Sequence, residues 1–541
     1  MAEQAGVAQT PRAVIDSRVV VTGVTLDSRA IRPGDLYAAL PGANVHGARF
    51  VGGAVGLGAV AVLTDPAGAA LLALKEITVP VLVVPEPRAV LGGVAALVYG
   101  RAGEALTMVG ITGTNGKTTT AYLLDSALRA LGRMTGLIGT VETRIGDDRI
   151  KSIRTTPESP DLHALFAVML ERGVDTCTME VSSHALALHR VDGVRFDLVA
   201  FTNLSQDHLD FHGSMEDYFL AKSMLFTPQR AVRALVCVDD AWGRRLARES
   251  GVPVVTISSD PRVSADWLIL ATGPGEAAFE LVGDGRRLSL RSALPGDFNR
   301  VNTAVAALLL LAAGHPAEAV QAALAADPHV PGRMERIVAA GSPDADQSHP
   351  EHSRLPLAFV DFAHTPDAVA AALTALRHRT PGSLIVVLGA GGDRDRGKRA
   401  AMGAAAAAHA DLVIVTDDNP RSEDPATIRA AVLSGATAQR SAGSAGSTGS
   451  ARPGRIREIG DRGRAIREAV AGAGEGDTVM VLGKGHESGQ DVAGVVHPFD
   501  DRERLRAALV EHLSGQAHSV RASGDGQVSG DGPGVTGGNV R

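Results

Sequence analysis

Residues 106–131, LTMVGITGTNGKTTTAYLLDSALRAL, determine the fold that the sequence predicts for the middle of the chain. The first seven residues form a short apolar run typical of a buried strand, and the residues after 119 have the apolar spacing of a helix. Between them lies a glycine-rich turn, GTNGKTT, at residues 113–119. A strand, a glycine-rich turn and a helix in this order are the setting that a phosphate-binding P-loop requires.

In such a loop the glycines let backbone N–H groups face phosphates, and the helix N-terminus favours their negative charge. We expect Lys117 to reach the terminal phosphates and Thr118 to ligate magnesium. The residues expected to bind ATP here are Gly113, Thr114, Asn115, Gly116, Lys117, Thr118 and Thr119. The loop is a variant of the common pattern, because isoleucine occupies position 111 and the nearest glycine before it is Gly110.

The alternation of strand and helix continues on both sides of this loop. Further strand candidates are TCTMEV at 176–181, DLVAFTN at 197–203 and ALVCVD at 234–239. This alternation predicts a parallel sheet with helices on both faces. Before residue 100, short apolar runs between Gly and Pro predict a small α/β domain. After Pro331 a third α/β block begins, with strand candidates at 356–362, 383–389, 411–417 and 477–483.

We therefore predict the α/β class and three domains, at residues 1–104, 105–335 and 336–514, in a chain of 541 residues. Two segments rich in Gly, Ser and Pro, at 341–355 and 441–454, are interpreted as surface insertions. Residues 515–541 have the same composition and are predicted to be a disordered tail.

Composition limits the classes of protein. The 53 Lys and Arg against 60 Asp and Glu give a net charge of -7, which disfavours a protein whose main ligand is nucleic acid. Two cysteines cannot build a disulfide framework or a four-thiolate zinc site, which points to a reducing cytosol. The longest apolar stretch, 304–314, is too short to span a bilayer. With no evident signal peptide, we expect a cytoplasmic protein without membrane insertion.

Glu180 ends the strand candidate at 176–181 and is a candidate magnesium ligand, because ligands of parallel sheets bind at the carboxyl ends of the strands. A solvated strand end is the alternative. Ser182, Ser183 and His184 follow directly and suggest a hydrolase triad. Adjacent residues rarely meet in triad geometry, and the G-x-S-x-G turn is absent, so we exclude a serine hydrolase.

His208 and His212 have the spacing of zinc ligands on one helix face. Leu209 stands where the H-E-x-x-H motif has glutamate, which disfavours zinc, and His208 remains a candidate metal-site residue. Lys222 lies in the mostly apolar segment YFLAKSMLF. From the residues alone, it is better interpreted as a helix lysine whose aliphatic stem packs against apolar neighbours.

Eleven motifs occur in order between residues 113 and 487: GTNGKTT, TTPES, MEVSSHAL, NLSQDHLDFHG, YFLAKSMLF, GDFNRVN, PGRME, DFAHTPD, GGDRDRGKR, DDNPR and GKGHE. Together they resemble the Mur ligase family of peptidoglycan synthesis, and among its members those that add diaminopimelate. The resemblance covers nearly the whole chain except the two insertions and the tail. The segment LDSRAIRPGDLYAALPGANVHGARF, at 26–50, is similar to the uridine-binding start of the family.

The resemblance implies an amide-forming ligase. ATP would phosphorylate the D-glutamate carboxylate of UDP-N-acetylmuramoyl-L-Ala-D-Glu, and the amine of diaminopimelate would then attack the acyl phosphate. The meso isomer is expected, and the LL isomer remains open. The N-terminal domain would bind the UDP-sugar, the central P-loop domain ATP, and a Rossmann-like C-terminal domain the amino acid. These partners are small molecules, and we expect a monomer.

The resemblance also implies roles for individual residues. Lys117, His208 and Lys222 would be catalytic. Thr118 and Glu180 would hold one Mg²⁺, and His208 and Lys222, carbamylated by CO2, would hold a second, which replaces the packed-lysine interpretation. Further ATP contacts would come from Asn302, Arg333 and Asp361. The expected contacts of the nucleotide-linked peptide are Leu26, Ser28, Thr155, Thr156, Ser182 and Arg190. Those of diaminopimelate are Arg394, Asp418, Asn419, Pro420, Arg421, Gly483 and Glu487.

Two other functions compete with this interpretation. Folylpolyglutamate synthase shares the P-loop domain and a related C-terminal domain, but lacks the long N-terminal segment and the DNPR loop. A P-loop nucleotide switch would usually carry the guanine-binding motif N-K-x-D, which is absent from the sequence. Phosphate release that requires both the peptide acceptor and the amino acid would distinguish a ligase from a switch.

Overall fold

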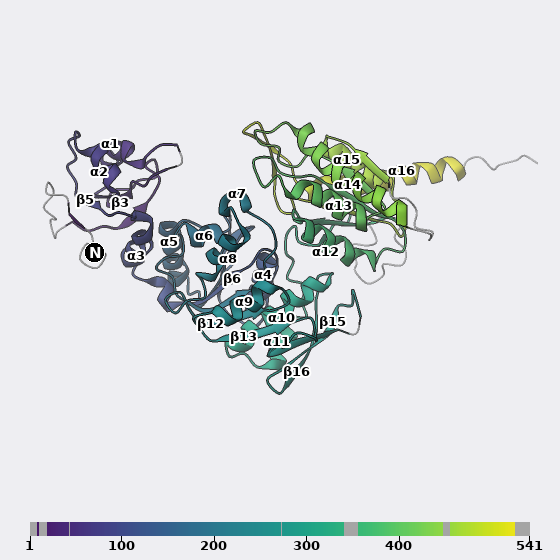
Figure 1. Ribbon diagram of the computed structural model, residues 1–541, viewed down its shortest axis with the longest axis horizontal. Helices are drawn as coiled ribbons and strands as arrows, with labels where there is room; N and C mark the ends of the chain where they lie inside the picture. Colours follow the sequence, from purple (N-terminus) through teal and green to yellow (C-terminus); the bar gives the residue numbers. More distant parts are fainter. Residues whose placement is uncertain are drawn as a thin grey trace, which may run out of the picture. The chain divides into compact units, whose positions relative to one another are not determined.

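The computed structural model describes residues 8–9, 19–42, 44–271, 273–339, 355–446 and 455–524. The chain divides into two compact units, residues 1–331 and 332–541, each of which is described by itself (Figure 1). Within the described residues, no helix combines the length and the apolar character needed to cross a membrane.

The first unit begins with a five-stranded sheet in the order β1-β5-β4-β3-β2. Its strands are β1 (Ala8–Gln9), β2 (Gly23–Thr25), β3 (Asp35–Ala38), β4 (Ala61–Thr64) and β5 (Val81–Val83), and its helices are α1 (Val51–Gly56), α2 (Pro66–Leu72) and α3 (Pro87–Val98). All pairs are parallel except β1 with β5. Neighbouring residues of β3 enter different cores: Leu36 packs with Leu91 of α3, whereas Tyr37 packs with Leu72 of α2.

An eleven-stranded sheet follows, in the order β16-β15-β14-β13-β12-β11-β6-β10-β7-β8-β9. Its strands are β6 (Thr107–Thr112), β7 (Thr135–Ile138), β8 (Glu142–Ile145), β9 (Asp148–Lys151), β10 (Thr176–Glu180), β11 (Phe196–Phe201), β12 (Ala231–Cys237), β13 (Val254–Ser258), β14 (Trp267–Ala271), β15 (Ala278–Gly283) and β16 (Arg286–Arg291). The run from β14 to β7 is parallel, as the sequence predicts. The strands β8, β9, β15 and β16, which the sequence did not predict, extend both ends as antiparallel pairs.

Helices cover both faces of this sheet: α4 (Lys117–Ala130), α5 (Ser159–Glu171), α6 (Ser183–Ala187), α7 (Leu209–His212), α8 (Met215–Ser223), α9 (Ala241–Glu249), α10 (Asp297–Ala312) and α11 (Ala317–Ala323). Successive residues of β11 alternate between two cores. Leu198 joins the core under α4 and α10, and Val199 joins the core that contains Phe166 of α5. This alternation fixes β6 and β11 at the centre of the sheet, buried on both sides.

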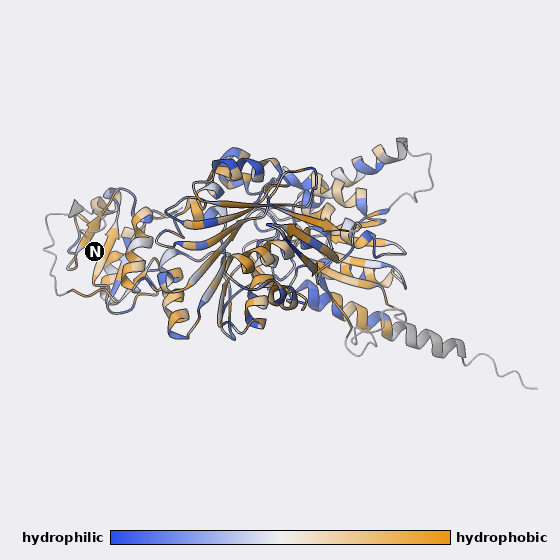
Figure 2. Cartoon of the chain, turned by 90° about the horizontal axis from the view of Figure 1, so that it is seen from below, coloured by the Kyte–Doolittle hydropathy of each residue, from blue (hydrophilic) through white to orange (hydrophobic). Residues whose placement is uncertain are grey.

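The second unit is a six-stranded sheet in the order β17-β18-β22-β19-β20-β21. Its strands are β17 (Glu335–Arg336), β18 (Leu357–Asp361), β19 (Leu384–Leu388), β20 (Leu412–Val415), β21 (Arg455–Glu458) and β22 (Thr478–Leu482), with helices α12 (Pro366–Arg377), α13 (Lys398–His409), α14 (Pro425–Gly446), α15 (Arg462–Ala471) and α16 (Asp501–Gly524). Only β17 pairs antiparallel among these strands. The strands of this sheet and of the central sheet are mostly hydrophobic, as Figure 2 shows.

A separate hairpin, β23 (Gly489–Val492) and β24 (Val495–Pro498), follows β22. The predicted insertions at 341–355 and 441–454 and the predicted tail lie largely outside the described residues, and they stay predictions. Within the described part, α14 continues to Gly446 and α16 to Gly524. The predicted domain boundaries also stay predictions.

Candidate active site

The P-loop connects β6 to α4 at the centre of the large sheet. Gly113 and Gly116 have φ angles of +144° and +89°, which residues with a side chain rarely adopt. A Cβ on Gly116 would lie 2.5 Å from Oδ1 of Asn302 on α10, so this close approach also requires glycine. The N–H groups of Thr114 and Asn115 donate to the backbone oxygen and to Oδ1 of Asn203, at 2.8 and 2.9 Å. The strand ends and α10 therefore fix the loop.

Two lysines meet at this loop. Lys117 Nζ donates to the carbonyl oxygens of Gly113 and Thr114, at 3.0 and 2.9 Å. Lys222 Nζ, from α8, donates to the same Gly113 oxygen at 2.8 Å and lies 4.6 Å from the ring centre of Tyr218. Lys222 is 1% exposed. Burial, and then the positive charge of Lys117, lower the pKa of Lys222 well below its usual value.

Thr118 and Glu180 are in direct contact, as the sequence predicts for two ligands of one ion. Thr118 Oγ1 donates to Oε2 of Glu180 at 2.9 Å, and the backbone N–H of Thr140 donates to Oε1 at 2.8 Å. Glu180 is fully buried at the end of β10. A hydroxyl and a carboxylate are oxygen ligands of the kind that Mg²⁺ prefers, so this donor set fits the expected ion.

The described residues hold no cluster of three His, Cys, Asp or Glu able to bind a metal. The expected magnesium ligands do not require such a cluster, because they include a hydroxyl and a modified lysine. His208 precedes α7 with a φ of +54°. Its ring centre lies 6.2 Å from that of Tyr218, whose hydroxyl shares a 3.2 Å hydrogen bond with Thr114. His208 therefore lies on the same side of the P-loop as Lys222.

Four residues expected to bind the nucleotide-linked peptide meet beside Glu180. Thr156 Oγ1 donates to the Glu180 carbonyl at 2.9 Å and accepts from the Ser182 N–H at 3.1 Å. Arg190 NH1 donates to the Thr156 carbonyl at 3.4 Å. The hydroxyls of Thr155 and Thr140 are 3.1 Å apart. The remaining two, Leu26 and Ser28, follow β2, and no contact between described residues joins them to this group.

Arg333 and Asp361, the ATP contacts expected in the second unit, lie close together. The Asp361 carboxylate accepts from the N–H groups of Met334 and Ala363, both at 2.7 Å. The Arg333 guanidinium lies 4.3 Å from the ring centre of Phe362. Burial raises the pKa of Asp361, and the charge of Arg333 and the two N–H groups oppose that rise.

Arg421 has a φ of +52°, the left-handed conformation that glycine adopts most readily. Its N–H donates to the Asp491 carbonyl at 3.0 Å, and its own carbonyl accepts from Ala493 at 2.7 Å. NH1 of Arg421 donates to the Gly392 carbonyl at 2.6 Å. The hairpin β23–β24 and the GGDRD loop thus hold this residue from two sides. Arg394, in the same GGDRD loop, is exposed.

The other residues expected to bind diaminopimelate converge at the ends of β20 and β22. The Asn419 amide donates to Glu487 at 2.8 Å. Gly483 has a φ of +115°, and a Cβ there would lie 2.6 Å from Oδ2 of Asp418. Pro420 follows Asn419 in the same loop. Two carboxylates, of Asp418 and Glu487, therefore lie within one small region of the second unit.

Sequence reasoning missed three residues of these clusters. Lys484 Nζ donates to Asn419 Oδ1 at 2.9 Å and to Glu487 at 3.0 Å. The Gln490 amide donates to the Asp418 carbonyl at 2.7 Å. Glu158 forms an ion pair with Arg190 at 3.0 Å. Lys484 and Glu158 lie inside the motifs GKGHE and TTPES, but only the pairing of loops far apart in sequence shows what they contact.

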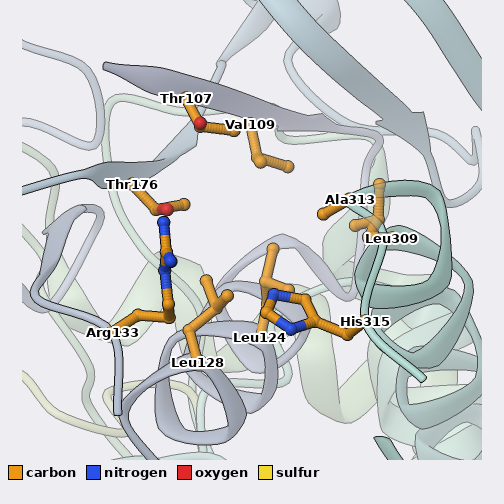
Figure 3. A pocket seen from close by; sticks show the side chains of 9 residues that line it. All are labelled: Thr107, Val109, Leu124, Leu128, Arg133, Thr176, Leu309, Ala313 and His315. Carbon is orange, nitrogen blue, oxygen red and sulfur yellow. The ribbon is translucent and has the colours of Figure 1, made fainter. Parts of the chain in front are cut away.

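The first unit and the second unit each contain a cavity. One, of about 100 Å³, opens at the amino-terminal ends of β6 and β10, opposite to the P-loop end of the strands (Figure 3). It is lined by Thr107, Val109, Leu124, Leu128, Arg133, Thr176, Leu309, Ala313 and His315, none of which is a predicted site residue. The other, of about 340 Å³, lies beside the DNPR loop and includes Pro420, Arg462 and Gln490.

Comparison with known proteins identifies the family. The model of the Mur ligase middle domain matches residues 111–310, that of the "Mur ligase family, catalytic domain" matches 20–99, and that of the "Mur ligase, glutamate ligase domain" matches 347–485. A protein of Streptomyces avermitilis is 54% identical over 512 residues, which cover 94% of this chain and 96% of that protein. The chain belongs to the Mur ligase family. That relative is named UDP-N-acetylmuramoyl-L-alanyl-D-glutamate–2,6-diaminopimelate ligase.

Solved structures agree with the fold of this Mur ligase. A structure titled with the same ligase name is 30% identical, covers 93% of this chain and 98% of its own, and superposes with a TM-score of 0.62. The folylpolyglutamate synthase of Mycobacterium tuberculosis reaches a TM-score of 0.56 at 20% identity, over 72% of this chain and 91% of its own. That second likeness shows the fold alone.

These findings confirm the predicted α/β class with the three-domain Mur ligase fold. They also confirm the predicted class of enzyme: this Mur ligase is an ATP-dependent, amide-forming ligase. The parallel strands that the sequence predicted therefore belong to a nucleotide-using enzyme.

Proposed function

We propose that this Mur ligase adds diaminopimelate, with the meso isomer expected, to the D-glutamate carboxylate of UDP-N-acetylmuramoyl-L-Ala-D-Glu. The product is the nucleotide-linked tripeptide used as a peptidoglycan precursor. The observation that carries the proposal is the charge arrangement of the second unit, where Lys484 bridges the carboxylates of Asp418 and Glu487 and Arg421 belongs to the same loop as Asp418. An amino acid with its own distal ammonium and carboxylate could pair its ammonium with these carboxylates and its carboxylate with Arg421. The name of the 54% identical relative supports the same substrate.

The P-loop residues suit phosphoryl transfer to a carboxylate. Lys117 and the N-terminus of α4 present positive charge where phosphates would lie. When bound, ATP supplies the phosphoryl group and Mg²⁺ neutralises phosphoryl oxygens. Thr118 and Glu180 would hold one Mg²⁺, and Asn302 supports Gly116 beneath the loop. Positioning and charge neutralisation are the main contributions a protein makes to such a reaction.

Lys222 is proposed to carry a carbamate formed from CO2 and to hold a second Mg²⁺ together with His208. A buried amine with a lowered pKa is neutral more often, and the neutral amine is the form that reacts with CO2. The carbamate would replace a buried cation beside Lys117 by an anion, which removes the repulsion between two ammonium groups.

The remaining assignments follow the same proposal. Leu26, Ser28, Thr155, Thr156, Ser182 and Arg190 would bind the nucleotide-linked peptide, and Arg333 and Asp361 would contact ATP. Residues 1–104, 105–335 and 336–514 would be the UDP-sugar, ATP and amino-acid domains. We propose further that the enzyme works in the cytoplasm as a monomer on small-molecule substrates.

The test is a coupled assay of phosphate release with ATP, Mg²⁺ and the nucleotide-linked dipeptide. meso-Diaminopimelate, LL-diaminopimelate, L-lysine and L-glutamate are offered separately, and the products are weighed by mass spectrometry. We expect phosphate release only when dipeptide and diaminopimelate are both present, with a product heavier by one diaminopimelate residue. Equal use of L-lysine, or phosphate release with L-glutamate in place of diaminopimelate, would contradict the proposal.

A further inference from the structure

Lys484 is the most deeply buried charge in the cluster that contains Asp418 and Glu487. Its side chain is 0% exposed, and it follows β22 at the carboxyl end of the sheet. Nζ donates to Asn419 Oδ1 at 2.9 Å and to Glu487 Oε2 at 3.0 Å. It also lies 3.6 Å from Oδ1 of Asp418. One ammonium therefore contacts three groups expected to bind the amino acid.

These contacts fix the relative positions of two loops. Asn419 belongs to the loop after β20, and Glu487 belongs to the loop after β22. Asn419 Oδ1 accepts from Lys484 and from the N–H of Asp491, while its amide donates to Glu487. Every polar atom of the Asn419 side chain thus has a partner, so its orientation is fixed.

The charges of the cluster are unequal. Asp418 and Glu487 carry two negative charges and Lys484 one positive charge. Arg462 also interacts with both carboxylates, but its charge is balanced by Asp501, so one negative charge is left. Asp418 is 7% exposed, and its Oδ1 accepts no hydrogen bond within the described part of the chain. A single ligand ammonium would both neutralise the cluster and supply this oxygen with a donor. A buried charge without a partner is unfavourable, which makes such a match selective.

We propose that Lys484 is a positioning residue for selection of the amino acid: its ammonium holds Asn419 and Glu487 in place and leaves the cluster one negative charge for one substrate ammonium. The proposal rests on the proposed function, because it assumes that this cluster binds the distal end of diaminopimelate. Lys484 itself need not touch the substrate.

The test compares steady-state kinetics of wild type and Lys484→Met in the full-length enzyme. We expect the KM for diaminopimelate to rise by about tenfold or more, because truncating one partner leaves a buried charged cluster unbalanced. The KM values for ATP and the nucleotide-linked dipeptide should change by less than about twofold. Lys484→Gln, which keeps a donor without the charge, should lie between wild type and Lys484→Met.

The control variant is Arg377→Met. Arg377 ends α12 and pairs with Asp411 and the Gly382 carbonyl, so the change removes polar contacts of the same unit away from the cluster. It should leave the KM for diaminopimelate unchanged. A double-mutant cycle of Lys484→Met with Glu487→Gln should show effects well below additive, because both changes disrupt one contact.

An unchanged KM for diaminopimelate in both Lys484 variants would overturn the proposal, as would equal effects on all three substrates. Should Lys484→Met not fold, Lys484→Gln decides alone by the same criteria. A wild-type enzyme that makes no amide with diaminopimelate would instead overturn the proposed function. The two failures are therefore distinguishable from the wild-type assay.

Discussion

Lys117 and Lys222 donate to the same acceptor, the carbonyl oxygen of Gly113, at 3.0 and 2.8 Å. Two ammonium groups so close together repel each other, and the deeper one, Lys222, has the lowered pKa. The P-loop lysine thus lowers the pKa of a lysine on α8 that lies 105 residues later in the chain. A change of Lys222 from cation to anion would convert this repulsion into attraction.

Replacing Lys222 by alanine should therefore abolish nearly all ligase activity, since the proposed carbamate would be lost. Added short carboxylates such as acetate should restore part of the activity by occupying the vacated space. The measurement is the rate of tripeptide formation against acetate concentration.

Lys222→Arg serves as the control for charge. A guanidinium stays positive and forms no carbamate, so this variant should be inactive and should not respond to acetate. A Lys222→Ala enzyme with wild-type activity in the absence of added carboxylate would contradict the carbamate proposal.

Lys117→Ala should lower kcat by on the order of a hundredfold or more, the usual loss when a preorganised charge at a phosphoryl group is removed. The fold should persist, because the Lys117 ammonium donates to carbonyl oxygens of its own loop and α4 is held by its buried face. Arg129→Ala is the matched control on the same helix, where Arg129 pairs with the exposed Asp147. Its kcat should stay within about twofold of wild type.

Arg421→Ala should raise the KM for diaminopimelate by on the order of a hundredfold. The variant removes the guanidinium proposed to bind the distal carboxylate of diaminopimelate, which would leave that carboxylate without its partner. ATP and nucleotide-peptide affinities should be nearly unchanged. Arg396→Ala is the control, since Arg396 lies in the neighbouring loop and its side chain is 73% exposed. If Arg421→Ala weakens all three substrates equally, the loop does not set specificity.

The sequence predicted the parallel strands and the P-loop because both depend on local patterns, apolar runs and closely spaced glycines. It also placed Thr118 near Glu180, since carboxyl ends of neighbouring parallel strands meet at one edge. The antiparallel strands β8–β9 and β15–β16 were missed: β9 is exposed throughout and β16 alternates, so neither forms a continuous apolar run.

The role of Lys484 was beyond sequence reasoning for another reason. Its partners Asn419 and Glu487 come from two loops, and the lysine is buried only because β20 and β22 end on the same side of the sheet. The left-handed backbone conformation of Arg421 could not be predicted either, because the usual sequence signal for it, a glycine, is absent at this position. Arg421 holds this conformation through backbone pairing with the hairpin residues around Val492.

The two cysteines predict a pH dependence of stability. Burial raises the pKa of both Cys177 and Cys237. In the unfolded chain a thiol ionises above about pH 8.5, whereas the folded protein keeps it protonated, so stability is full below that pH and falls above it. The loss is up to about 1.4 kcal/mol per pH unit for each thiol.

Denaturant unfolding followed by tryptophan fluorescence measures this effect, because Trp242 and Trp267 lie in the same unit as both cysteines. Between about pH 8.5 and 10, the free energy of unfolding should fall less steeply in Cys177→Ala than in wild type. Identical slopes would show that Cys177 ionises equally in both states. Native wild type should also resist thiol reagents at pH 8.

The second unit depends on one fully buried ion pair. Arg462 Nε and NH2 donate to the two carboxylate oxygens of Asp501, at 2.7 and 2.6 Å, and both side chains are 0% exposed. NH2 also donates to the Leu482 carbonyl at 2.8 Å, which ties β22 to the starts of α15 and α16.

Asp501→Asn should destabilise the second unit by about 3–5 kcal/mol, because it leaves the Arg462 charge buried without its counterion. Glu468→Gln is the control, since it breaks the exposed pair with Arg464 and should cost about 0.5 kcal/mol or less. Both tryptophans lie in the first unit, so fluorescence does not report this change, and hydrogen exchange of the β22 amides does. Exchange at residues 478–482 should accelerate strongly in Asp501→Asn and hardly in Glu468→Gln. Equal protection in the two variants would contradict the dependence of the second unit on this ion pair. Arg462→Met combined with Asp501→Leu removes both charges, so exchange in this double variant should be slower than in Asp501→Asn.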